Sequence, residues 1–206
     1  MNSPNVTDYL KLALTHVLVP IILVLSLAAP LAAGPFEDAV AAHNKGDYAT
    51  AFRLWRPFAD QGNAHAQVNL GLMYAKGQGT PQNYAEALKW FRLAANQGDA
   101  DAQYNLGLMY ARSRGVPLDY AEAMQWLQKA ADQDNATAQF SLGAMYANGQ
   151  GVPRDHVRAQ MWLNLAAARG YQEAIKYRDI IAQRMTPGQL AEAEKLAREW
   201  KPKSER

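Results

Sequence analysis

Side chains that could serve as nucleophiles or as acid–base groups are scarce in this chain. Beyond residue 33 the serines are Ser113, Ser141 and Ser204, and the histidines are His43, His65 and His156. An enzyme needs a nucleophile or an acid–base pair held by an orienting partner, and none of these residues stands in a nucleophile elbow or an HExxH helix. No metal-ligand spacing is recognisable either. We therefore expect no catalytic residue, no metal site and no cofactor.

The composition excludes further classes of function. The chain has 206 residues, of which 49% are hydrophobic and 19% charged, a globular composition long enough for one elongated domain. The formal net charge is only +2, and no run of lysine or arginine longer than a pair interrupts the repeats described below, so a nucleic-acid partner is not expected. Because the chain has no cysteine, disulfides and thiolate ligands are ruled out and packing alone must stabilise it.

The N-terminal segment differs in kind from the rest. Lys11 precedes an apolar run over residues 17–29, and small residues follow it up to Ala33. This layout is typical of a signal peptide covering residues 1–33, with cleavage after Ala33. The alternative is an uncleaved anchor, since residues 10–33 exceed the roughly 20 apolar residues that span a bilayer. We expect a periplasmic or secreted protein or, with the anchor, repeats held outside the cytoplasm at the inner membrane.

A short phrase recurs three times at a spacing of 36 residues. It reads AQVNLGLMYAK at 66–76, AQYNLGLMYAR at 102–112 and AQFSLGAMYAN at 138–148. Self-similarity at a fixed period indicates a repeat array. The expected units are a divergent N-terminal repeat (34–63), three full repeats (64–99, 100–135 and 136–171), C-terminal capping helices (172–200) and a frayed tail (201–206).

Each repeat predicts a pair of helices. Ala66, Leu70, Met73 and Tyr74 fall at i, i+4, i+7 and i+8, one stripe of a first helix. Gly71 lies in that stripe although glycine costs about 1 kcal/mol against alanine in a helix, so we expect a Cβ there to block the neighbouring helix. Stacking successive pairs buries both of their apolar faces. The predicted fold is an all-α solenoid of antiparallel helix pairs.

The loops and the second helices carry matching signals. Each loop has a glycine where the first helix ends, followed by a proline; Ser113 replaces that glycine in the second copy, where a left-handed backbone is expected. Three residues are predicted N-caps of the second helices: Asn83, Asp119 and Asp155. Glu86 and Glu122 stand where capping boxes would form. Trp90, Trp126 and Trp162 recur as the large inward ring, with Trp126 expected in the core.

The C-terminus predicts the end of the array. Arg178 and Asp179 replace the Leu-Gly pair that a further repeat would need. In MTPGQL, Thr186 is a predicted N-cap that Gln189 completes as a capping box. The helix that follows is expected to fold back over the exposed end of the solenoid.

The combined pattern AxxxLGxxYxxGxGVxxDxxxAxxWxxxAAxxG resembles the Sel-like repeat (SLR) family, a relative of the tetratricopeptide repeat (TPR). The resemblance covers roughly residues 36–172, and GDYATAFRLW in the first copy is closer to a tetratricopeptide loop. Departures are Ser113 for glycine, Thr80 for valine and Asp134 for glycine. The resemblance implies a protein that binds other proteins and holds complexes together.

When the three repeats are aligned, each aligned position forms a column, and the columns whose residues differ between copies are free to carry function. In the first helix they are His65/Asp101/Thr137, Val68/Tyr104/Phe140, Leu72/Leu108/Ala144 and Lys76/Arg112/Asn148. If the array exposes the face that tetratricopeptide arrays expose, these columns line its concave side. The predicted partner-binding residues are Val68, Leu72, Lys76, Tyr104, Leu108, Arg112 and Phe140. Alternatively, the apolar members are core between repeats, and Lys76 and Arg112 interact favourably with the dipoles of the helices that end beside them.

We therefore expect a non-catalytic protein–protein interaction module or scaffold of the cell envelope. It would act as a monomer and bind a protein or peptide segment with apolar anchors and a nearby carboxylate. A membrane would be involved only if the N-terminal segment stays uncleaved. The alternative, which the resemblance suggests, is an envelope enzyme acting on peptidoglycan or a β-lactam.

Overall fold

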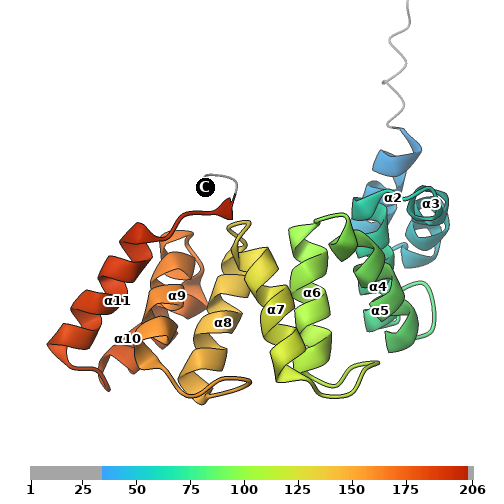
Figure 1. Cartoon of the computed structure of the whole chain (residues 1–206). Coiled ribbons are helices and arrows are strands. Elements are labelled where there is room, and N and C mark those ends of the chain that lie inside the picture. Colours follow the sequence, from blue (N-terminus) through green and yellow to red (C-terminus); the bar gives the residue numbers. More distant parts are fainter. Residues whose placement is uncertain (1–33, 204–206) are drawn as a thin grey trace, which may run out of the picture. The chain divides into compact units, whose positions relative to one another are not determined.

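The computed structural model describes residues 34–203, and these residues form helices and no strands (Figure 1). The helices are α2 (Pro35–Asn44), α3 (Tyr48–Asp60), α4 (Ala64–Lys76), α5 (Tyr84–Asn96), α6 (Ala100–Ala111), α7 (Tyr120–Ala131), α8 (Ala136–Asn148), α9 (His156–Ala168), α10 (Gln172–Ala182) and α11 (Pro187–Glu199). None of these helices is long and apolar enough to cross a membrane. The predicted signal peptide or anchor lies outside the described residues.

The helices pack as consecutive pairs. Within a repeat, α4 packs on α5, α6 on α7 and α8 on α9, and the second helix of each pair also packs on the first helix of the next. Figure 1 shows this succession from α4 to α9. The predicted all-α solenoid of helix pairs is therefore confirmed.

Glycine in the first helices allows close approach of the partner helix, as expected. A Cβ on Gly71 would lie 2.6 Å from the ring of Phe91 in α5. A Cβ on Gly107 would lie 2.8 Å from Cγ of Leu127 in α7. Real Cβ atoms do not approach so closely, so the seam between paired helices depends on glycine despite its low helix propensity.

The loop prediction for Ser113 is also confirmed. Gly77 and Gly149 end α4 and α8 with φ of +69° and +70°, and Ser113 adopts φ +54° at the same place. A second loop glycine is needed for stacking: a Cβ on Gly115 would lie 2.7 Å from the backbone oxygen of Tyr84, at the start of α5.

The N-caps are formed as predicted, but the capping boxes of the second helices are not. The Asn83 side chain accepts hydrogen bonds from two backbone amides of α5, and that of Asp119 accepts one from α7. The carboxylate of Glu122 instead accepts a hydrogen bond from Trp126 Nε1 at 2.8 Å. Glu86 pairs with Lys89 at 3.9 Å. Each glutamate thus contacts a side chain one turn further along its own helix and does not accept a hydrogen bond from the backbone of the N-cap residue.

The three tryptophans at the same position of the repeat differ in burial. Trp90 and Trp162 are buried, at 3% and 5% exposure, whereas Trp126 is only half-buried. The expectation that Trp126 lies fully in the core is therefore wrong. Its indole nitrogen is bonded to Glu122 at the half-exposed edge, and Lys129 Nζ lies 3.9 Å from its ring centroid.

The C-terminal helix ends the array as expected. Thr186 and Gln189 form the capping box that begins α11, and α11 packs on α9. Trp200, just after α11, stacks edge-on against Trp162 at 5.9 Å between centroids. The expectation of a frayed tail from residue 201 is wrong for its first residues, because Pro202 is buried and the Lys203 amide donates to the Asp132 carbonyl at 2.7 Å.

Candidate partner-binding site

Three hollows follow helix α6 from its N-terminus to its C-terminus. The acidic hollow, of about 410 Å³, is lined by His65, Val68, Asn69, Leu72, Asp99, Asp101, Tyr104, Asn105 and Thr137. The basic hollow, of about 280 Å³, is lined by Leu108, Ala111, Arg112, Tyr120, Leu127, Phe140, Ser141, Ala144, Met145 and Gln150. The connecting hollow, of about 60 Å³, is lined by Ala75, Tyr84, Phe91, Asn105, Leu108, Met109, Arg112 and Arg114. Shared side chains link them: Asn105 lines the first and third, and Leu108 and Arg112 line the second and third.

The structure places six of the seven predicted residues in these hollows. Val68, Leu72 and Tyr104 line the acidic hollow, and Leu108, Arg112 and Phe140 line the basic hollow. Lys76, exposed at the end of α4, lines none of the three. The apolar members also pack inward: Val68 is 8% exposed, and Leu72 packs against the same buried cluster. They thus contribute to the core and form the floor of the hollows.

Tyr104 and Phe140 occupy one column but differ in their contacts. Phe140 packs on two rings of the C-terminal cap, Tyr171 at 5.1 Å and Tyr177 at 6.0 Å between centroids. Burial, and to a lesser degree the neighbouring Tyr171, raise the pKa of the Tyr104 phenol, and the charge of Arg112 partly opposes that rise. The phenol is therefore neutral at the floor of the acidic hollow.

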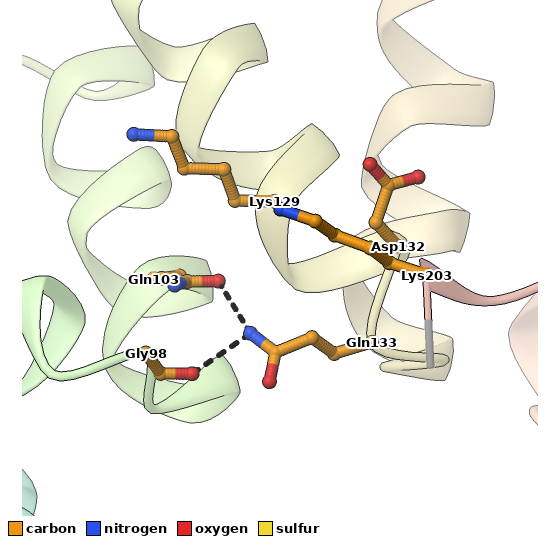
Figure 2. Close-up of a pocket in the computed structure, with 6 residues that line it drawn as sticks. All are labelled: Gly98, Gln103, Lys129, Asp132, Gln133 and Lys203. Carbon is orange, nitrogen blue, oxygen red and sulfur yellow. Dashed lines mark hydrogen bonds between the residues drawn. The ribbon is translucent and has the colours of Figure 1, made fainter. Parts of the chain in front are cut away.

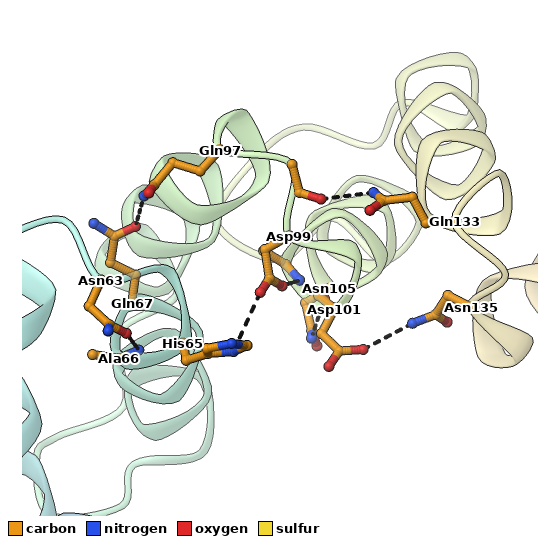
Figure 3. Close-up of polar contacts among 12 residues, drawn as sticks. Asn63, His65, Ala66, Gln67, Gln97, Asp99, Asp101, Asn105, Gln133 and Asn135 are labelled. Carbon is orange, nitrogen blue, oxygen red and sulfur yellow. Dashed lines mark hydrogen bonds and ion pairs between the residues drawn. The ribbon is translucent and has the colours of Figure 1, made fainter. Parts of the chain in front are cut away.

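The acidic hollow has a polar rim that joins neighbouring repeats (Figure 3). His65 Nδ1 lies 3.8 Å from a carboxylate oxygen of Asp99. Asn135 donates to the Asp101 carboxylate at 2.9 Å, and Asn105 donates to the Asp101 backbone oxygen at 2.8 Å. Of the described residues that line this hollow, none is a lysine or an arginine.

A buried glutamine ladder, to which sequence reasoning assigned no role, also joins the repeats. Gln67 donates to the Ala59 carbonyl at 3.1 Å and accepts from Gln97 at 2.8 Å (Figure 3). One repeat later, Gln103 donates to Ala95 and accepts from Gln133. The signal was present in the sequence, because Gln67, Gln103 and Gln139 recur in all three copies. It marks structure, since the amides of Gln67 and Gln103 each satisfy a backbone carbonyl between repeats.

The ladder changes at the third junction, which explains one departure from the repeat pattern. Asp134 stands where a glycine is expected and adopts φ +67°. Its carboxylate accepts from Gln139 at 3.0 Å and pairs with Arg169, the residue that replaces the glutamine of earlier junctions. The strained backbone is thus accompanied by a charged contact that the other junctions lack.

A further hollow, of about 460 Å³, lies where the C-terminal segment returns to α7 (Figure 2). Gln133 spans it by donating to the Gly98 carbonyl and to Gln103, both at 2.8 Å. Its walls are Gly98, Gln103, Lys129, Asp132, Gln133 and Lys203. Because its amides are bonded to one another and Lys129 lies over Trp126, this hollow belongs to the inter-repeat packing.

Within residues 34–203 no group of three or more histidine, aspartate and glutamate side chains could hold a metal ion. His156 begins α9 with its Nδ1 buried and without a hydrogen-bond partner. The described residues that line the three hollows provide apolar floors, side-chain amides and separated charges.

Stacked helix pairs with a hollowed face define a helical-repeat protein of the tetratricopeptide-like class. The Sel1 repeat family matches residues 44–63, 64–99, 100–135 and 136–171, more than half of the chain. The chain therefore belongs to the Sel1 repeat family. Proteins of this family are generally protein-interaction modules.

Two solved structures resemble the chain. The Sel1 repeat protein from Oxalobacter formigenes has 31% identity and a TM-score of 0.67, covering 72% of this chain and 59% of its own. The protein c5321, a protective antigen of uropathogenic Escherichia coli strains with an SLR fold, has 28% identity and a TM-score of 0.56, covering 79% and 44%. The chain thus spans less than two thirds of either protein. Comparison with curated proteins gives no match.

Proposed function

We propose that this chain is a non-catalytic interaction module that binds an extended segment of a protein partner in the three hollows along α6. The supporting observation is that variable columns of the repeat, and not its fixed columns, supply most of the lining. Helical-repeat proteins generally present such extended surfaces to partners. Aromatic and arginine side chains such as Tyr104 and Arg112 are the types that most often dominate binding energy.

Site-specific photo-crosslinking tests this proposal. A photoreactive side chain replaces Leu108, which lines two of the hollows, and in a control it replaces Leu93, which is 43% exposed on α5 and lines none of them. We expect a discrete partner adduct from position 108 that is absent from position 93. Identical adducts from both positions, or none from position 108, would contradict the proposal.

We further propose that the module acts as a monomer outside the cytoplasm, after cleavage behind Ala33. The support is the apolar run and the small residues that close it. N-terminal sequencing of the exported protein should begin at Gly34, and size-exclusion chromatography with light scattering should give a monomer mass. Full-length protein that resists carbonate extraction from membranes would favour the anchored form.

A further inference from the structure

Helix α6 differs from α4 and α8 by carrying charge at both of its ends. The four positions concerned are Asp99, Asp101, Arg112 and Arg114 in the middle repeat, against Asn63, His65, Lys76 and Gln78 in the repeat before it and Asn135, Thr137, Asn148 and Gln150 in the repeat after it. Asp99 and Asp101 thus line the acidic hollow, Arg112 lines both of the other hollows, and Arg114 lines the connecting hollow.

Helix capping does not require these charges. Asn63 and Asn135 cap α4 and α8 by accepting from the third amide at 2.9 Å and 3.0 Å, and Asp99 does the same for α6 at 2.8 Å. The helix dipole favours acids at the first turn and bases at the last. That preference acts equally on α4 and α8, which lack the full set of charges. The charges of α6 therefore need a reason beyond the helix itself.

Three of the four charged residues are open to a partner. Asp101, Arg112 and Arg114 are exposed, whereas the Asp99 side chain is only 12% exposed and caps α6. Asp101 is held in place by an amide, from Asn135, and none of the described residues lining the hollow is a lysine or arginine that would compensate its negative charge (Figure 3). Arg114 lies over the ring of Tyr84, with its guanidinium carbon 5.5 Å from the ring centroid. Between the two ends, the half-buried side chains of Tyr104 and Leu108 provide apolar surface.

The spacing of the charges sets the length of the segment they would fit. Asp101 and Arg112 are eleven residues apart in the sequence, a rise of about 16 Å along a helix at 1.5 Å per residue. An extended chain covers that distance with about five residues at roughly 3.3 Å each.

We propose that the hollows along α6 select an extended peptide segment of dipolar charge. Such a segment has a basic side chain at the exposed Asp101, with the less exposed Asp99 beside it, an acidic side chain at Arg112 and Arg114, and apolar side chains between them. The basic and acidic residues are separated by about five positions. This inference rests on the proposed function, because it specifies the partner of the same hollows, and charge complementarity is what carries it.

The chain itself suggests variants that should preserve the fold. The acidic-end variant Asp99→Asn with Asp101→Thr and the basic-end variant Arg112→Asn with Arg114→Gln each install residues of the following repeat. The control variant, Arg184→Gln with Glu192→Gln, removes one charge of each sign at exposed positions near and within α11. Circular dichroism and thermal melting should show all three folded like the parent.

The probe is a display library of random ten-residue peptides, selected on the immobilised full chain at low salt. We expect the enriched peptides to share a basic and an acidic residue about five positions apart with apolar residues between. Each end variant should weaken a selected peptide by roughly three- to tenfold, and the control variant should not. Neutralising the matching charge of the peptide should remove the effect of the variant at that end only.

The outcomes separate this inference from the proposed function. In one outcome, the selected peptides compete with one another and crosslink to position 108, yet share no charge pattern and bind both end variants as tightly as they bind the parent. That result would overturn the dipolar segment and leave the proposed interaction surface standing. If no peptide is enriched, or the enriched peptides crosslink only to position 93, both proposals are contradicted.

Discussion

The middle repeat buries its tryptophan less completely than the repeats on either side. Trp90 lies in the cluster that includes Trp55 of the shortened first unit, and Trp162 meets Trp200 of the C-terminal segment. Trp126 packs against the cluster that includes Phe91 of the preceding repeat but stays half-buried, and Lys129 of its own helix lies over its ring. The same residue type at the same position of the repeat therefore has a different environment in the middle repeat.

The seam inside each pair, in contrast, is the same in the middle repeat and the next. A Cβ on Gly107 would lie 2.8 Å from Leu127 Cγ, and a Cβ on Gly143 would lie 2.8 Å from Leu163 Cγ. The middle repeat thus keeps the common seam and departs from its neighbours on the outer surface and along the hollowed face of α6.

The largest expected effect distinguishes the two tryptophan environments. Trp162→Ala should destabilise the fold by about 3–5 kcal/mol through lost burial and a cavity, and Trp126→Ala by about half as much. Urea unfolding of both variants measures the difference. Equal losses would show that the half-exposed position of Trp126 has no energetic meaning.

Substitution of the seam glycines should give the next largest loss of stability, and the loss should be the same in both repeats. Gly107→Ala and Gly143→Ala should each cost about 1–3 kcal/mol, because the added methyl overpacks against leucine. Gly188→Ala is the matched control: nothing lies within 4 Å of its added Cβ in α11, so higher helix propensity should leave stability unchanged or raise it by up to about 1 kcal/mol. A cost at Gly107 clearly different from that at Gly143 would contradict a common seam.

Recurrence within one chain was enough to predict the fold, because fixed columns report the packing that every repeat shares. The N-cap Asn83 and the capping box at Thr186 follow from local rules of helix geometry, whereas Gly71 follows from the close approach of the paired helix that every repeat shares. Recurrence was a poor guide where the surroundings differ between repeats. Trp126 looked like its neighbours in sequence, and the order of the C-terminal segment at Lys203 involves a hydrogen bond to the Asp132 carbonyl, at a residue distant in the chain.

For the candidate site, the variable columns predicted which side chains line the hollows but not their electrostatic pattern. Tyr104 and Arg112 lie where the helical period places them. The acidic end was missed because Asp101 was considered only as a member of a variable column and Asp99 was not considered, and because Lys76 was expected to share the groove. The sequence does contain the difference between the charged Asp99 and the neutral Asn63 and Asn135 at the same position of the repeat. Only the structure shows that Asp99 lines a hollow.

Tyr104 provides a pH-dependent test of the hollowed face, since the next repeat has Phe140 in the same column. Its pKa is raised by burial in the folded state, so the unfolded chain loses the phenol proton first, near the ordinary value of 10.0. Folding stability should therefore be unaffected below that pH and should fall as pH rises above it. Tyr104→Phe should reduce this alkaline decline, measured as urea midpoints between pH 8 and 11. An unchanged decline would show that the phenol is as solvated in the folded protein as in the unfolded chain.

The smallest expected effect concerns the loop in which the middle repeat departs from both neighbours. Ser113 adopts φ +54° where Gly77 and Gly149 adopt nearly the same conformation, and a left-handed backbone is costly for a residue with a Cβ. Ser113→Gly relieves that cost. It also raises the conformational entropy of the unfolded chain and removes the exposed hydrogen bond, 3.2 Å long, that Ser113 Oγ donates to the Val116 carbonyl. The net result should be a gain of about 0.5 kcal/mol. The reverse change, Gly149→Ser, should cost a similar amount, and urea midpoints of the two variants and their combination test both. A loss on Ser113→Gly would mean that the serine hydroxyl contributes more to the loop than the strained backbone takes away.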